Sequence, residues 1–413
     1  MIKFTRHTLD NGLTMICNTD TSTPFVSVNI LYKVGARDED PNRTGFAHLF
    51  EHLMFGGSKH IADYDYHVQK AGGDSNAFTN NDYTNYYITI PAPNIETALW
   101  LESDRMLALD FSQKSLDVQR NVVIEEFKQR YFNNPYGDIW LKLRPLAYKV
   151  HPYQWPTIGK NIDHIAGASL EEVEDFFHRF YAPDNAILSI SGNITDEKAL
   201  ELVKKWFGDI PPARYKRKAL PMEPQQTEER RLVCEHNKVP ADAIYKVYHM
   251  CDRRSDNFYT CDTISDILSN GQSSRLYINL IKNGKLFSEV DAYITGDMDP
   301  GLFIFSGKLS EGVAIEEAEA AIQNEIDRFI EDPISERELQ KVINKTEARI
   351  SYSEINYQGK SANLAFFDYL GDINLINSEC TRYAEVSLDS IKQTARELFS
   401  AQNCSTLWYL KDK

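Results

Sequence analysis

Hydrophobic and polar positions alternate, or recur with helical spacing, along most of the chain. In the first half, alternating apolar residues from Val26 to Tyr32 predict one strand, and residues 83–90 predict another. Apolar residues that recur every three or four positions predict helices over residues 47–54, 95–109, 116–131 and 170–180. Because strands and helices are mixed within this stretch, the pattern predicts an α+β fold with a mainly antiparallel sheet.

The second half repeats this mixture after a segment rich in proline and charge. Prolines in residues 211–231 exclude a regular helix or a central strand, so this segment is predicted to be a linker. The pattern beyond it predicts a strand at 243–249, a helix over 259–281, strands across 290–309, and helices from residues 315, 336 and 388. We therefore predict domains at 1–210 and 232–413, each a mainly antiparallel sheet covered by helices.

The two halves also share a local sequence pattern. A Ser-Leu pair, a helix, an asparagine and a strand occupy residues 169–191 and again residues 387–410, at an offset of 218 residues. This repeat indicates two homologous domains. The same offset sets three residues of a candidate metal site against three residues without that chemistry: His48 against Asp266, Glu51 against Ser269, and His52 against Asn270. Only the first domain is then expected to hold a metal ion.

The net charge of the chain argues against two classes of binding partner. The chain has 45 basic and 60 acidic residues, a net charge of −15, which argues against nucleic acid or an anionic membrane as a partner. No apolar run approaches the roughly 18 residues of a membrane span. The first residues lack the apolar stretch of a secretion signal, so we expect a cytoplasmic protein, or a periplasmic one if a leader is removed.

The segment His48-Leu49-Phe50-Glu51-His52 carries the most specific chemical signal in the chain. Residues four apart lie on one face of a helix, so the two imidazoles can reach a single ion. Two neutral imidazoles suit zinc, and a catalytic zinc also needs a third protein ligand and a water molecule. Glu51 lies beside that face and is the candidate general base for this water. The alternative is a surface helix with two solvated histidines.

A third ligand is expected from the helix predicted over residues 116–131. Glu125 and Glu126 follow the apolar trio 122–124, which places acidic groups at the edge of a buried face. Spacing alone does not choose between the two carboxylates. Two exposed helix glutamates without a metal are the alternative.

Four segments together resemble the pitrilysin/insulinase family of inverted-motif zinc peptidases, in particular its half-length members. Residues 45–57, Gly-Phe-Ala-His-Leu-Phe-Glu-His-Leu-Met-Phe-Gly-Gly, are similar to the extended family signature, and the acidic segment follows about 74 residues later. Residues 72–79 and 191–194 also fit, and the resemblance covers essentially the whole chain. It implies two repeated domains and one zinc ion per chain.

The resemblance also assigns roles to individual residues. It implies that His48, His52 and Glu126 bind zinc and that Glu51 activates the water. It further implies an edge strand that pairs with extended peptide substrates, formed by Ser75, Asn76, Ala77 and Phe78. Main-chain pairing binds a peptide with little regard to its side chains, so broad sequence tolerance is expected. The alternative for this segment is an ordinary strand.

One position and one segment depart from the family pattern. Gln119 stands where many relatives carry a second glutamate, so any outer support to the zinc from this position comes from a neutral amide. Residues 282–288 lack the arginine and the tyrosine with which active relatives hold the substrate backbone. We therefore expect a dimer, possibly a heterodimer in which a related chain supplies both groups. Arg275 is the alternative cation within this chain.

These observations predict a zinc metalloendopeptidase that hydrolyses short or unfolded peptides through a water activated by Glu51. Two alternatives share the same fold. One is a non-catalytic assembly subunit, like the core proteins of respiratory complexes, and the other is a module that captures peptides without cutting them. A scaffold has no need of two histidines and a glutamate around one point.

Overall fold

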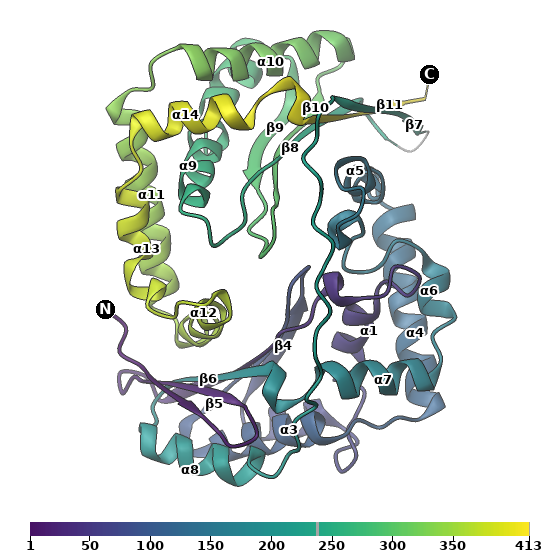
Figure 1. The fold of residues 1–413 in the computed structure, drawn as a ribbon, viewed down its shortest axis with the longest axis vertical. Helices are drawn as coiled ribbons and strands as arrows, with labels where there is room; N and C mark the ends of the chain where they lie inside the picture. Colours follow the sequence, from purple (N-terminus) through teal and green to yellow (C-terminus); the bar gives the residue numbers. More distant parts are fainter. Residues whose placement is uncertain (237–238, 413) are drawn as a thin grey trace. The chain divides into compact units, whose positions relative to one another are not determined.

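The computed structural model describes residues 1–236 and 239–412, which form two compact units (Figure 1). The first unit contains Met1–Arg130, Trp155–Pro221 and Ser351–Asn377, and the second contains Tyr131–Gln154, Met222–Ile350 and Ser378–Lys413. Each unit therefore includes one segment from the opposite half of the sequence. The limits 1–210 and 232–413 divide the sequence rather than these units, and they stay a prediction.

Six strands form the sheet of the first unit, in the order β1-β2-β6-β3-β5-β4. They are β1 (Thr5–Thr8), β2 (Thr14–Thr19), β3 (Phe25–Tyr32), β4 (Asp74–Thr79), β5 (Thr84–Pro91) and β6 (Ala186–Gly192). Strands β2 and β6 are parallel, and the other neighbours are antiparallel. The strands predicted at 26–32 and 83–90 are β3 and β5, which pair with each other, and β4 forms one edge of the sheet.

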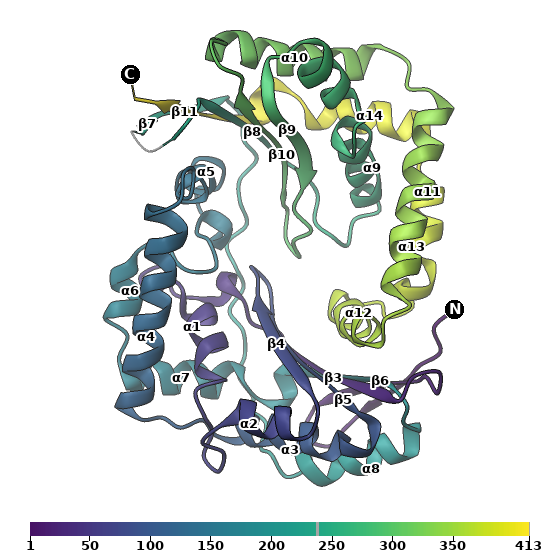
Figure 2. The ribbon, with the colours of Figure 1, turned by 180° about the vertical axis from the view of Figure 1, so that it is seen from behind.

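Both faces of the central strands in this sheet are buried. On β3, Ser27 and Asn29 are as fully buried as the apolar residues with which they alternate. Helix α12 (Tyr357–Leu370) lies beside β3 and β6 on this second face, as Figure 2 shows. Ser27 Oγ is 2.8 Å from Ser361 Oγ of that helix. Small polar side chains thus let a helix from the far end of the chain pack closely on the sheet.

The other helices of the first unit lie on the opposite face of the sheet or beside it. Helix α3 contacts β3 and β5, and α1 contacts both β4 and α4. The helices are α1 (Phe46–Leu53), α2 (Tyr64–Lys70), α3 (Ile95–Leu107), α4 (Gln113–Phe127), α6 (Ile162–Ala166), α7 (Leu170–Phe180) and α8 (Asp196–Phe207). Helix α4 continues as a π-helical turn at Lys128–Phe132, a feature that is frequent at functional sites.

Five strands form the sheet of the second unit, in the order β7-β11-β8-β10-β9. They are β7 (Arg230–His236), β8 (Ala243–His249), β9 (Phe287–Ile294), β10 (Leu302–Leu309) and β11 (Cys404–Lys411). Helix α5 (Ile139–Ala147) packs on one face, and α9 (Asn257–Ser269), α10 (Ile315–Glu331) and α14 (Leu388–Leu398) lie on the other. Helices α11 (Glu336–Ser353) and α13 (Leu375–Ala384) contribute residues to the same core from beside the sheet. In neither unit does a described helix combine the length and apolar character needed to cross a membrane.

The extent of one helix predicted in the second unit is wrong. The pattern over residues 259–281 predicts a single helix, whereas α9 ends at Ser269 and a separate π-helical segment covers Tyr277–Asn283. Gly271 interrupts the run with a φ of 95°, a backbone conformation that ends a helix. The apolar spacing continues across this break because both segments bury residues in the same core.

The same helix-to-strand motif occurs in both sheets. Ser169 caps α7 and Ser387 caps α14, each through its side-chain oxygen. Asn185 and Asn403 then donate to the last-turn carbonyls of these helices, at 2.8 and 2.9 Å. Strands β6 and β11 follow, and each pairs in parallel with one neighbour. The α+β fold class, with two mainly antiparallel sheets covered by helices, is confirmed.

Candidate metal centre

Helix α1 carries the His-x-x-Glu-His segment, and a distant side chain caps its start. The N-cap residue Gly45 has a φ of 93° and no side chain to accept the free N–H groups of the first turn. A Cβ at this position would lie 2.6 Å from the carbonyl oxygen of Ile158. The buried Glu39 carboxylate accepts hydrogen bonds from the N–H groups of Gly45 and Ala47, each at 2.8 Å. Trp155 Nε1 donates to the same carboxylate at 3.1 Å.

Three side chains of the first unit converge on one point. The Nε2 atoms of His48 and His52 lie 3.6 and 3.4 Å from Oε2 of Glu126. One ligand atom from each residue lies within 4.8 Å of the others. Zinc binds nitrogen and oxygen at about 2.0–2.2 Å, so the ligand atoms of a tetrahedral site are separated by roughly 3.3–3.5 Å. The observed spacing fits a single zinc ion among the three side chains.

Packing of helix α4 determines which of the two candidate glutamates faces the histidines. Val123 and Phe127 are buried, and this rotation of the helix points Glu126 toward α1. The Glu125 side chain is 71% exposed, and its carboxylate binds Lys128 at 2.7 Å. Of the two carboxylates that spacing leaves open, Glu126 is the one that faces the histidines.

The surroundings favour protonation states that bind metal. Burial lowers the pKa of His48 to about 4, so its imidazole is neutral at neutral pH. Among the described residues, the buried Nδ1 of His48 has no partner that would stabilise a charged ring. A hydrogen bond with His52 lowers the pKa of Glu126, and the neighbouring positive charges act in the same direction. Neutral imidazole and ionised carboxylate are the forms that a metal ion requires.

The second oxygen of the Glu126 carboxylate is also held. Arg130 lies one turn further along the chain, and its NH2 group is 3.0 Å from Oε1 of Glu126. Oε2 is the oxygen that faces the two imidazoles. An outer partner of this kind fixes the orientation of a metal ligand.

Glu51 projects from the same helix as the two histidines. Its carboxylate accepts a hydrogen bond at Oε2 from Oγ1 of Thr79, the last residue of β4, at 2.6 Å. Burial raises the pKa of Glu51, although this hydrogen bond and the charge of His52 lower it. A carboxylate with a raised pKa is a better proton acceptor near neutral pH. The arrangement places a candidate base directly beside the candidate metal ligands.

Comparison with known proteins assigns the chain to a family. Residues 14–141 match the family described as "Insulinase (Peptidase family M16)", and residues 167–346 match "Peptidase M16 inactive domain". The chain belongs to the M16 peptidase family. The resemblance to the pitrilysin/insulinase family, inferred from the sequence motifs, is thereby confirmed.

Similar proteins match nearly the full length of the chain. "Zinc protease PqqE" of Helicobacter pylori is 29% identical over 97% of this chain and 91% of that protein. "Uncharacterized zinc protease YmxG" of Bacillus subtilis is 24% identical over 97% of this chain and 96% of that protein. The crystal structure of a protease from Helicobacter pylori matches with a TM-score of 0.93 at 26% identity, covering 99% of this chain and 100% of that one.

The predicted substrate-binding residues of this M16 chain lie on β4, at the edge of the first sheet. Ser75 and Ala77 are half-buried, whereas Asn76 and Phe78 are exposed, Phe78 by 40%. Oδ1 of Asn76 accepts a hydrogen bond from the N–H of Ala77 at 2.8 Å. The outer side of β4 has no neighbouring strand among the described residues, so its main chain can pair with a peptide.

Gln119 lies on the same helix as Glu126, two turns earlier. Its side-chain amide approaches Gly56, where an added Cβ would lie 3.3 Å from Nε2 of Gln119. In the part of the chain that the structure describes, no hydrogen bond joins Gln119 to His48, His52 or Glu126. An outer role for Gln119 at the metal stays a prediction.

In the second half, the residues that the sequence offset sets against His48, Glu51 and His52 are joined by hydrogen bonds to other side chains. On α9, Nδ2 of Asn270 donates to Asp266 at 2.7 Å, and Ser269 donates to Asp291 at 3.1 Å. The group of metal-type ligands found among the described residues is the one on α1 and α4. A metal site in the first half alone stays a prediction.

Arg275, the alternative substrate-binding cation, is already engaged. Its Nε and NH2 groups donate to the two oxygens of Glu338, at 2.9 and 3.2 Å. Phe287, which stands where active relatives present a tyrosine, is only 2% exposed. The structure therefore offers no support for Arg275 as a substrate ligand.

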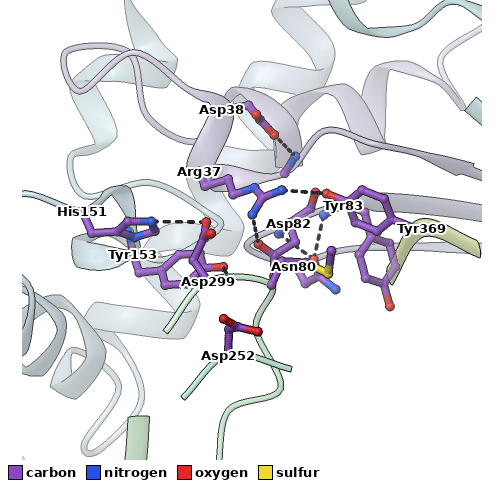
Figure 3. Close-up of polar contacts among 12 residues, drawn as sticks. Arg37, Asp38, Asn80, Asp82, Tyr83, His151, Tyr153, Asp252, Asp299 and Tyr369 are labelled. Atoms are coloured by element: carbon purple, nitrogen blue, oxygen red, sulfur yellow. Dashed lines mark hydrogen bonds and ion pairs between the residues drawn. The ribbon is translucent and has the colours of Figure 1, made fainter. Parts of the chain in front are cut away.

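A polar cluster fixes the loop that follows β4. NH1 of Arg37 is 3.1 Å from Oδ1 of Asp82, and NH2 of Arg37 donates to the Tyr369 hydroxyl at 2.8 Å. That hydroxyl donates to the carbonyl oxygen of Asp82 at 3.1 Å, and Figure 3 shows these three residues together. Because Tyr369 belongs to α12, a segment from the second half of the sequence holds the β4–β5 turn.

Three supporting residues of the site were not foreseen from the sequence. Arg130 could have been found, because it stands four residues after Glu126 on a predicted helix. The sequence indicates Glu39 only weakly. A helix that starts at Gly45 without a capping side chain needs an acceptor for its first N–H groups from elsewhere in the chain. Thr79 lies in the segment 72–79 that fits the family pattern, but nothing in the sequence pairs it with Glu51, which is 28 residues away in the chain.

Proposed function

We propose that this chain is a zinc-dependent metalloendopeptidase that hydrolyses short or unfolded peptides. The observation that carries the proposal is the convergence of His48, His52 and Glu126, with interatomic distances that suit one zinc ion per chain. A buried carboxylate, Glu51, lies beside this cluster. The names of the relatives PqqE and YmxG, both zinc proteases, support the same chemistry.

The roles of the residues follow from their positions. His48, His52 and Glu126 would hold the zinc, which when bound polarises the scissile carbonyl and lowers the pKa of a water molecule to about 7. Glu51 then takes a proton from the attacking water and passes it to the leaving amine. The burial that raises the pKa of Glu51 favours this proton uptake.

Edge strand β4 is the proposed binding site for the substrate. An extended peptide would pair with its main chain along Ser75, Asn76, Ala77 and Phe78. Such pairing requires a segment without its own secondary structure, so short or unfolded peptides are the substrate class. Because main-chain groups supply most of the contacts, we expect cleavage of many sequences.

A second chain is proposed to complete the substrate site. Residues 282–288 lack the arginine and tyrosine expected from the family resemblance, and Arg275 is engaged with Glu338. A related chain that carries both groups would supply them in a dimer. Size-exclusion chromatography with peptidase assays tests this: strong activity from a monomer of this chain alone would contradict the need for a partner.

Metal analysis and peptide cleavage together test the proposed function. Purified protein should contain about one zinc per chain. Glu126→Gln should lose the zinc, and the matched variant Glu125→Gln, altered at the exposed neighbour, should keep it. With a quenched peptide library and the partner present, wild type should cleave, whereas Glu51→Gln should bind zinc without cleaving.

The two rival functions predict different results in the same assays. A non-catalytic assembly subunit would contain no stoichiometric zinc, and the "inactive domain" description of the match at residues 167–346 gives this rival its support. A zinc-stabilised module that only captures peptides would bind zinc and peptide, but neither wild type nor Glu51→Gln would cleave. Zinc binding and cleavage that depends on Glu51 exclude both.

A further inference from the structure

One side chain joins the candidate base to the edge strand of the first sheet. Oγ1 of Thr79 donates to Oε2 of Glu51 at 2.6 Å, which is short, as expected for a bond to a charged acceptor. Within residues 1–236 and 239–412, no other hydrogen bond to this carboxylate is found. The orientation of Glu51 therefore depends on a residue outside its own helix.

The position of Thr79 follows from the alternation of side chains along β4. Residues two apart on a strand share a face, so Thr79 projects on the same side as Ser75 and Ala77, all of which are half-buried. Helix α1 contacts β4. The Cα of Thr79 pairs with that of Thr84, a buried residue whose hydroxyl donates to the Val34 carbonyl at 2.9 Å. The end of β4 that carries the Thr79 hydroxyl is thus fixed by its pairing with β5.

We propose that Thr79 is a positioning residue that holds Glu51 from the end of strand β4. The inference rests on the proposed peptidase function. A glutamate side chain has several rotatable bonds, and an unrestrained carboxylate would sample solvent as well as the metal site. Holding Oε2 leaves Oε1 as the oxygen that meets the water proton.

Two substitutions separate the hydroxyl from the rest of the side chain. Thr79→Val keeps the β-branched shape that suits a strand and removes the hydroxyl, whereas Thr79→Ser keeps the hydroxyl. Thr89→Val is the matched control: Thr89 is half-buried on the neighbouring strand β5, and its Cα pairs with that of Asp74 at the other end of β4. All three variants should retain the zinc content and thermal midpoint of wild type.

Steady-state kinetics with a quenched peptide give the expected pattern. Thr79→Val should lower kcat about tenfold, equivalent to about 1.4 kcal/mol, with KM within about twofold because the strand main chain is unchanged. Thr79→Ser should recover kcat to within about threefold of wild type, and Thr89→Val should match wild type. A Thr79→Val enzyme with wild-type kcat, or a Thr79→Ser enzyme as slow as Thr79→Val, would overturn the inference.

Crystal structures of the zinc-loaded wild type and variants supply a readout that does not depend on cleavage. The Glu51 carboxylate should occupy one position in wild type and Thr79→Ser, and it should be displaced or divided among conformers in Thr79→Val. An unchanged Glu51 in Thr79→Val would refute the positioning role. If wild type cleaves no peptide, the proposed function fails, and these structures still decide the role of Thr79.

Discussion

Replacing Arg130 by methionine is expected to weaken zinc binding without unfolding the first unit. NH2 of Arg130 lies 3.0 Å from Oε1 of Glu126 and leaves Oε2 directed at the imidazoles. Outer partners of metal ligands typically contribute 10–100-fold in affinity. Because the Arg130 side chain is 53% exposed, solvent screening places the expected loss at the lower end, about tenfold or 1.4 kcal/mol.

Competition with a chromogenic chelator measures this change in zinc affinity. Lys128→Met is the matched control, because Lys128 lies in the same turn but binds Glu125 at 2.7 Å. It should bind zinc as wild type does. Raising the salt to about 1 M should reduce the difference between wild type and Arg130→Met, since salt screens exposed charges. Equal losses in both variants, or no loss in Arg130→Met, would refute the orienting role of Arg130.

Two further predictions concern stability. Glu39→Ala should lower the free energy of unfolding of the first unit by about 2–4 kcal/mol, because two buried N–H groups at the start of α1 lose their acceptor; urea unfolding showing a loss below about 0.5 kcal/mol would contradict the cap. A hydrogen bond from Lys360 lowers the pKa of Asp20 from 3.8 to about 2. The stabilisation of the folded state by this pair is therefore fully present above the pKa of Asp20 in the unfolded state, and it is lost as the pH falls through about 2. The stability difference between wild type and Asp20→Asn should therefore vanish over that range, and a constant difference would be evidence against the pairing.

Helical spacing brings the two histidines of the candidate site together, but it does not identify the carboxylate. His48 and His52 share one helix, so their separation is fixed by helix geometry. Glu126 reaches them from another helix, and its direction depends on how α4 is rotated. Burial of Val123 and Phe127 sets that rotation, and neither spacing nor composition reveals it. Only the family resemblance favoured Glu126 over Glu125 before the geometry was known.

The sheet of the first unit shows a second limit of sequence patterns. Alternation along β3 correctly predicts a strand, but it also suggests that Ser27 and Asn29 face solvent. Both are fully buried, because α12 arrives from more than 300 residues away and covers that face. Periodicity reports the local element, whereas long-range packing decides which faces are covered. For the same reason, hydrophobic periodicity does not predict that each unit includes a segment from the opposite half of the sequence.

Binding of one zinc ion by His48, His52 and Glu126 can be tested in a crystal grown with zinc, with diffraction recorded on both sides of the zinc absorption edge. One anomalous peak per chain is expected, at about 2.0–2.2 Å from Nε2 of each histidine and from Oε2 of Glu126. Absence of that peak at saturating zinc, or a zinc ion bound without Glu126, would contradict this assignment of the ligands.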